Sequence, residues 1–92
     1  MRIYLPELFD LMAKEDVLTV LKWYVQEGDI VEPGAMLILL DAFDGEYTIP
    51  TPPTMTVPHR VIQLGKQVGD KAHLGDFLIS LEPAQDARPT RK

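Results

Sequence analysis

The 92-residue chain contains no cysteine and only two histidines. The absence of cysteine excludes disulfides, thiolate metal sites and thiol nucleophiles, and it leaves the redox compartment of the protein undetermined. Two histidines are also too few for a histidine-rich metal cage. Thiol and metal chemistry are therefore poor explanations of this sequence.

The chain also lacks a long apolar segment. Its first eleven residues are interrupted by Pro6, Glu7 and Asp10, so they form neither the core of a signal peptide nor a membrane-spanning run. We therefore expect a cytoplasmic location by default.

Positive charge is scarce, because 9 basic side chains stand against 14 acidic ones and the formal net charge is -5. The apolar pattern stops at Pro83, and the last ten residues read as a flexible tail with three basic residues and one acid. Without the tail, residues 1–82 hold 13 acids and 6 bases, a net charge of -7. Such a surface repels phosphate backbones, so we expect neither nucleic acid nor a membrane as partner.

Residues for catalysis are few as well. Ser80 is the only serine, and it lies in an apolar strand-like run instead of a nucleophile elbow. The pair Gly65-Lys66 lacks the spaced glycines and the following hydroxyl of a Walker phosphate loop. We therefore expect no enzymatic activity of the chain's own.

What the sequence does contain is an internal repeat. After a shift of 41 residues, segment 20–41 overlays segment 61–82 with 8 identities among 22 positions, including the Gly-Asp pairs 28–29 and 69–70. Each half reads as a strand, a Gly-Asp turn, a glycine (Gly34 or Gly75) and a second strand. Two such units bury their apolar faces best against each other, which predicts a sandwich with pseudo-twofold symmetry.

The local composition also favours β-structure. Residues 17–25, 36–40 and 77–81 are apolar runs rich in β-branched, aromatic or leucine residues, and turn residues bound all three. Only residues 7–14 have a helix-friendly composition, and their small number limits them to one turn. The expected fold class is all-β, in one domain spanning residues 1–82.

Several motifs together resemble the lipoyl and biotinyl carrier domain family, the swinging-arm domains of 2-oxo acid dehydrogenase complexes and biotin-dependent carboxylases. The resemblance covers most of residues 1–82. It rests on Leu5-Pro6-Glu7-Leu8 with Met12, on Lys-Trp-Tyr-Val-Gln-Glu-Gly-Asp-Ile-Val-Glu-Pro-Gly at 22–34, on Ile49-Pro50-Thr51-Pro52, and on Gly69-Asp70 with Gly75. It implies a flattened barrel-sandwich hybrid of two four-stranded antiparallel sheets with the same pseudo-twofold symmetry.

The family attaches its cofactor to one lysine at the tip of the hairpin between the repeats, and this chain has no lysine there. Counting back from residues 49–52, Asp44 falls at that position, and no lysine lies between Lys22 and Lys66. A carboxylate is no amine nucleophile and cannot form the amide that holds lipoate or biotin. The resemblance therefore implies the carrier fold without the carrier function, and we expect no cofactor.

The residues that replace the lysine predict a tight hairpin. Asp44-Gly45, flanked by Phe43 and Glu46, is a strong signal for a two-residue loop with both residues at its centre. The simplest interpretation is that this pair only closes the hairpin. Alternatively, Asp41, Asp44 and Glu46 form an acidic tip that binds a basic partner or a divalent ion, with Phe43 as an exposed anchor.

Two further segments depart from the family's pattern, and the family layout predicts both near the hairpin. The loop at residues 9–16 is longer than usual, and in lipoyl domains this loop helps to select the partner enzyme. The segment 52–59 contains three prolines where the family has a short link with a glycine. Both changes indicate either a different partner surface or drift after the loss of the old task.

Three functional hypotheses follow. The leading one is a non-carrier module for protein interaction or scaffolding, with a protein partner such as a component of a 2-oxo acid dehydrogenase or carboxylase system. The alternative is a true carrier domain, a non-catalytic part of an acyltransferase or carboxylase, that is modified at Lys22, Lys66 or Lys71. Against this alternative, we expect Lys22 in a strand and Lys66 and Lys71 on either side of a turn in the second repeat, away from the hairpin. The third is a small-molecule or ion site at the acidic tip and the proline-rich segment.

Overall fold

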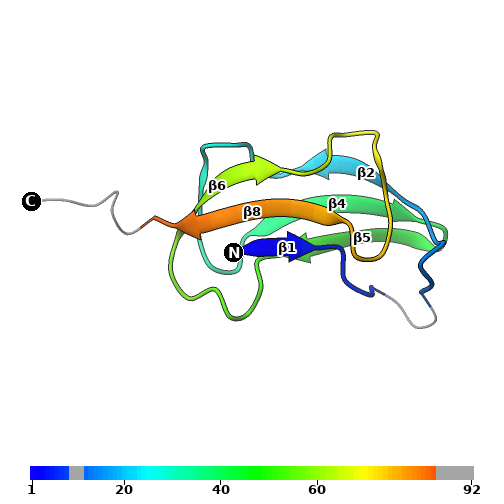
Figure 1. Ribbon diagram of the computed structural model, residues 1–92, viewed down its shortest axis with the longest axis horizontal. Coiled ribbons are helices and arrows are strands. Elements are labelled where there is room, and N and C mark those ends of the chain that lie inside the picture. Colours follow the sequence, from blue (N-terminus) through cyan, green and yellow to red (C-terminus); the bar gives the residue numbers. More distant parts are fainter. Residues whose placement is uncertain (9–11, 85–92) are drawn as a thin grey trace, which may run out of the picture.

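The computed structural model describes residues 1–8 and 12–84. These residues form eight strands and no helix, arranged as two four-stranded antiparallel sheets (Figure 1). The strands are β1 (Arg2–Tyr4), β2 (Leu18–Trp23), β3 (Ile30–Val31), β4 (Met36–Ala42), β5 (Gly45–Pro50), β6 (His59–Leu64), β7 (Lys71–Ala72) and β8 (Phe77–Pro83). The predicted all-β class and the two-sheet sandwich are confirmed.

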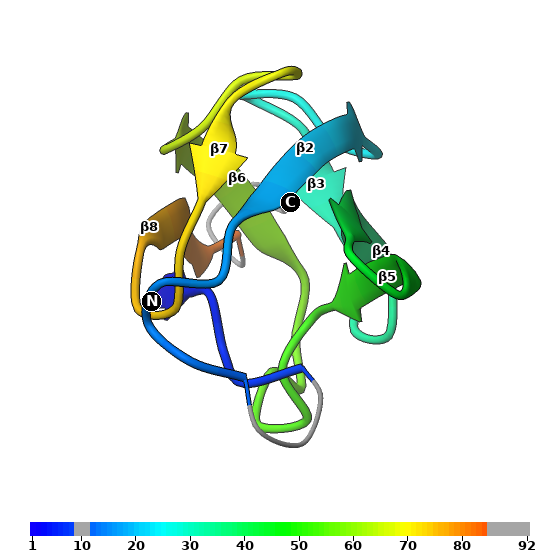
Figure 2. The same cartoon turned by 90° about the vertical axis from the view of Figure 1, so that its right-hand side faces the viewer.

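The two halves of the chain are interlocked. One sheet has the order β1-β8-β6-β3 and the other has the order β5-β4-β2-β7. Each repeat places its long strands in one sheet and its two-residue strand, β3 or β7, at the edge of the other sheet. Figure 2 shows the resulting pair of sheets end on, with β7 beside β2 at the top of the view. Neither half therefore forms a complete sheet without the other.

The internal repeat is confirmed at the level of single residues. The shift of 41 maps β2 onto β6, β3 onto β7 and β4 onto β8, and β2 and β6 have the same sequence of buried and exposed positions. The amide of Val20 donates to the carbonyl of Asp70 at 2.9 Å, and its counterpart Val61 donates to Asp29 at 2.8 Å. Both bonds join one half of the chain to the other.

The core lies between the sheets and is built from equivalent positions. Its most deeply buried side chains are Leu5, Leu18, Val20, Leu37, Ile38, Leu40, Val61, Leu78, Ile79 and Leu81. Burying one such side chain contributes about 1.5–3 kcal/mol. Leu18 has His59 as its counterpart, which is buried with its Nδ1 2.8 Å from the carbonyl oxygen of Val57. His59 is thus a hydrogen-bonded core residue.

The two Gly-Asp turns form as predicted, and the geometry explains both residue types. Gly28 and Gly69 have φ angles of 94° and 93°, which L side chains rarely adopt. The carboxylate of Asp29 accepts the amide of Gln26 at 2.9 Å, and that of Asp70 accepts the amide of Gln67 at 2.8 Å. Each aspartate therefore closes its own turn.

Ordered structure extends slightly past the expected end of the domain. Strand β8 continues to Pro83, and Ala84 is buried with its amide donating to the carbonyl of Pro58 at 3.1 Å. Residues 85–92, the rest of the predicted tail, lie outside the described residues. One helical turn was the most that the sequence allowed in segment 7–14. Its described residues, 7–8 and 12–14, form no helix, and residues 9–11 lie outside the described part.

The two repeats differ at the close approach of Gly65, just after β6, to Phe77 at the start of β8. Gly65 occupies the position of Tyr24, and Phe77 occupies that of Met36. A Cβ atom at Gly65 would lie 2.5 Å from both the carbonyl oxygen and the ring of Phe77. The second half therefore needs glycine at this position, whereas the first half has room for a tyrosine.

We predict that Gly65→Ala lowers the free energy of unfolding by about 1–3 kcal/mol, because the added methyl group must displace β8 or the Phe77 ring. Tyr24→Ala is the matched control at the equivalent position, and its half-exposed side chain should cost about 1 kcal/mol or less. Urea denaturation of both variants measures the difference. Equal stabilities would contradict the close approach.

Candidate functional site

The hairpin between β4 and β5 has a two-residue loop, but not at the predicted register. Ala42 pairs with Gly45, so the loop residues are Phe43 and Asp44. The prediction that Asp44 and Gly45 form the centre was wrong by one residue. Gly45 has a φ of 144° at the first position of β5, so its conformational freedom is used where the strand begins. Asp44 remains at the tip.

Phe43 exposes its whole side chain at this tip, with a relative exposure of 103%. Exposure of Phe43 belonged to the alternative interpretation of the hairpin, and this part of the alternative agrees with the structure. The hairpin lies at the end of the molecule opposite the N-terminus and the end of β8 (Figure 1). Such exposure is unusual for an aromatic side chain, which normally buries a large area.

Asp44 is held by a neighbour across the loop. The Tyr47 hydroxyl donates to the two carboxylate oxygens of Asp44, at 2.9 and 3.1 Å. This hydrogen bond, followed by partial burial and the negative charge of Asp44, raises the pKa of Tyr47 above its ordinary value of 10.0. This contact was not predicted from the sequence, although the spacing of three residues across a tight turn was a usable signal. The bond links the loop to strand β5.

A row of polar side chains crosses the sheet next to the tip. Asp41 pairs with Glu46 on β5 and with Thr19 on β2, and Thr19 pairs with Lys71 on β7. The expected proximity of Asp41 and Glu46 is thus confirmed, and two like charges opposite each other oppose folding slightly. The Lys71 ammonium donates to the Thr19 hydroxyl at 3.1 Å.

This row corrects the expected position of Lys71. We predicted that it lies away from the hairpin, but β7 pairs with β2 at the same end of the sheet, so Lys71 shares the row of Asp41. The error arose because the crossover of β7 into the other sheet was not foreseen. Lys71 nevertheless lies on a different strand from the hairpin loop.

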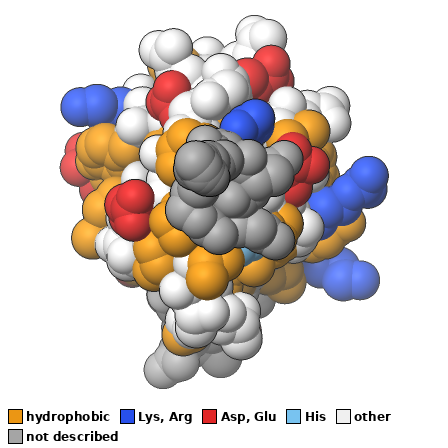
Figure 3. Space-filling model, turned by 90° about the vertical axis from the view of Figure 1, so that its left-hand side faces the viewer, with side chains coloured by type: hydrophobic (Ala, Val, Ile, Leu, Met, Phe, Trp, Pro, Cys, Tyr) orange, Lys and Arg blue, Asp and Glu red, His pale blue; other side chains and the backbone are white. Residues whose placement is uncertain are grey.

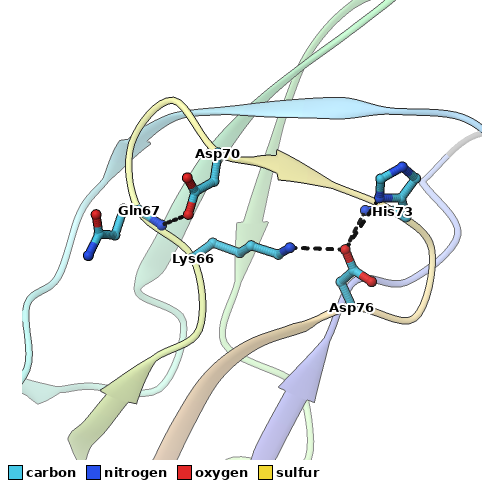
Figure 4. Close-up of polar contacts among 5 residues, drawn as sticks. All are labelled: Lys66, Gln67, Asp70, His73 and Asp76. Atoms are coloured by element: carbon cyan, nitrogen blue, oxygen red, sulfur yellow. Dashed lines mark hydrogen bonds and ion pairs between the residues drawn. The ribbon is translucent and has the colours of Figure 1, made fainter.

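Lys66 is engaged in a polar network of the second repeat (Figure 4). Its Nζ lies 3.1 Å from Oδ2 of Asp76, and the same oxygen accepts the amide of His73 at 2.9 Å. The His73 amide, and then Lys66, lower the pKa of Asp76 below its ordinary value of 3.8, against the opposing effect of burial. The backbone of Lys66 also accepts the indole N–H of Trp23 at 2.8 Å. Lys66 therefore joins the two halves.

Lys22, the remaining lysine of the carrier alternative, lies on strand β2. Its Nζ is 5.0 Å from the centre of the Tyr24 ring, within range of a cation–π interaction. The three candidate lysines thus come from a strand, a turn and an edge strand, and none belongs to the hairpin loop.

A hollow of about 320 Å³ adjoins the hairpin. It is lined by residues of the loop before β2 and of the hairpin: Asp16, Val17, Leu18, Ala42, Phe43 and Asp44. The first of these, Asp16, closes a turn in its loop by accepting the amide of Ala13 at 2.8 Å. The loop at 9–16 was expected near the hairpin, and its described end does lie there.

The proline-rich segment 52–59 lies at the other end of the molecule, so its expected position near the hairpin was wrong. Strand β5 runs away from the tip, and the carbonyl of Pro58 accepts the amide of Ala84 at the end of β8. Met55, within this segment, is buried. Figure 3 views this end of the molecule, where hydrophobic, acidic and basic side chains are interspersed.

Residues 1–8 and 12–84 contain no group of three or more His, Asp or Glu side chains arranged to hold a metal ion. The same residues include no helix that is long and apolar enough to span a membrane. No protein-family model, curated protein or solved structure gave a match to the chain. The chain's own residues are therefore the basis for inferring its function.

We predict an acid-dependent loss of stability that depends on Asp76. Because its pKa is lowered in the folded protein, the carboxylate contributes stability above its unfolded pKa, and this contribution is lost as the pH falls through the folded value. The melting temperature of the wild type should exceed that of Asp76→Asn between about pH 5 and 7, and the gap should shrink below about pH 4.

Glu82→Gln controls for the change in net charge without touching this network. A gap between wild type and Asp76→Asn that stays constant down to the most acidic measurable pH would contradict the role assigned to the His73 amide and Lys66.

Proposed function

We propose that this chain is a non-carrier protein-interaction domain that binds its partner through the β4–β5 hairpin. The observation that carries the proposal is Phe43, whose whole side chain is exposed on a restrained two-residue loop. Under the resemblance to lipoyl and biotinyl domains, this loop is where a cofactor would be attached, and Asp44 replaces the lysine. In the proposed role the hairpin is still exposed to a partner protein, but it carries no cofactor.

An exposed aromatic ring at a rigid tip suits a binding anchor. Aromatic residues are enriched among the few side chains that carry most of the energy of protein interfaces. A loop that is already ordered loses less conformational entropy on binding than a flexible one. The ladder from Ala42–Gly45 to Met36–Pro50 and the Tyr47–Asp44 hydrogen bond supply that order here.

The test is capture of partners from an extract of the native host with the wild-type domain and two variants. Phe43→Ala should lower the recovery of the specific partner about tenfold or more, as expected for an aromatic anchor. Val57→Ala removes an exposed apolar side chain from the loop at the other end of the molecule and should leave the recovery unchanged. Equal recovery with wild type and Phe43→Ala would overturn the proposal.

The alternative, a carrier modified at Lys22, Lys66 or Lys71, predicts a different mass. An unmodified chain has a mass of 10.4 kDa, and we expect this mass for the protein purified from its host. The ammonium of Lys66 is paired with Asp76 and that of Lys71 with Thr19, which disfavours both as exposed attachment points. A mass surplus equal to a lipoyl or biotinyl group would establish the carrier alternative instead.

A further inference from the structure

We propose that the hollow beside the hairpin binds the side chain of a lysine or arginine that the partner protein inserts. This inference rests on the proposed function and adds the chemistry of the partner. The hollow and the Phe43 anchor adjoin each other, since Phe43 itself lines the hollow. One partner surface could therefore contact both.

The lining of the hollow matches a side chain that is apolar along its length and cationic at its end. Val17, Leu18, Ala42 and Phe43 supply aliphatic and aromatic surface. Lysine and arginine cover such surface with their methylene groups while their charged ends reach a polar partner. The volume of about 320 Å³ leaves room for one such side chain.

Two aspartates complete the lining, and both have spare acceptor capacity. Asp16 accepts the backbone amide of Ala13, and Asp44 accepts the Tyr47 hydroxyl. Both donors are neutral, and within the described residues neither carboxylate forms an ion pair. A carboxylate has about four acceptor sites, so each can still accept hydrogen bonds from a cation.

The surroundings strengthen the preference for a cation. Asp41 and Glu46 form the cross-strand pair next to the loop, and none of the described residues that line the hollow is a lysine or an arginine. An anion would be repelled at this site, and a purely apolar group would bury two carboxylates without a counter-charge. Charge complementarity therefore selects a partner segment with an exposed basic side chain.

The experiment uses the full 92-residue chain labelled with ¹⁵N and the probe Nα-acetyl-lysine N-methylamide, followed by amide chemical shifts at low ionic strength. We expect saturable shifts confined to residues 16–18 and 42–44. Nα-acetyl-norleucine N-methylamide, which has an aliphatic side chain without the charge, should shift these amides far less. Asp44→Asn keeps an acceptor for Tyr47 and should weaken lysine binding about two- to fivefold, as for an exposed ion pair.

Glu82→Gln changes the net charge equally at the end of the molecule away from the hairpin and should leave the affinity unchanged. If Glu82→Gln weakens binding as much as Asp44→Asn does, or if the shifts spread over the whole surface, the proposed site is wrong. The cationic probe would then bind only by general attraction to the acidic protein. Equal binding of the norleucine probe would overturn the role of the carboxylates. Tighter binding of spermidine than of the lysine probe would indicate that the hollow binds a free polyamine. This result would overturn the proposal that it binds a basic side chain of a partner protein.

These results separate this inference from the proposed function. If Phe43→Ala abolishes partner capture but the lysine probe does not bind, only the inference about the hollow fails. If the probe binds but Phe43→Ala leaves partner capture unchanged, the anchor hypothesis fails while the hollow remains a cation site.

Discussion

The exchange of hydrogen bonds between the two halves is the constraint on which the rest of the fold depends. The amides of Gly28 and Gly69 each donate to a carbonyl of the other half, those of Val61 and Val20, both at 2.8 Å. Each Gly-Asp turn is therefore completed by a strand of the other half, 33 residues after Gly28 and 49 residues before Gly69. The exchange also places the short strands β3 and β7 at one edge of each sheet, opposite β1 and β5 at the other edge.

The two halves share this frame and differ in how they stabilise it. At the positions of Lys66 and Asp76 in the second half, the first half has Val25 and Ala35, and Val25 is buried. The first half thus buries Val25 where the second half has a member of an ion pair. The ion pair depends on pH and salt, whereas burial of valine does not. Because both halves share both sheets, loss of this ion pair in acid should lower the stability of the whole domain.

The features that the sequence predicted correctly are those that recur in both repeats. Paired identities at the Gly-Asp turns and in the strands 36–40 and 77–81 indicated equivalent elements, and packing of two equivalent units implied a sandwich. The errors concern features that depend on strand pairing. The loop register depended on the ladder pairing of Gly45, and the place of Lys71 depended on a crossover that local composition does not encode.

The hollow beside the hairpin was invisible in the sequence for a related reason. It is formed by two short stretches, residues 16–18 and 42–44, that come together only because β2 and β4 are neighbours in one sheet. No spacing rule connects these stretches along the chain. The Tyr47–Asp44 hydrogen bond, by contrast, is local and could have been foreseen from the turn.

The near-equivalence of the halves has a consequence for the order of the chain itself. The amino group of Met1 donates to the carbonyl of Leu81 at 2.8 Å, so the start of β1 lies against β8 much as β5 lies against β4. The hairpin loop at one end and the chain ends at the other are thus topological counterparts. A circularly permuted chain, with a short linker from Ala84 to Met1 and opened between Phe43 and Asp44, would carry the two halves in exchanged order and should keep the strand pairing of both sheets.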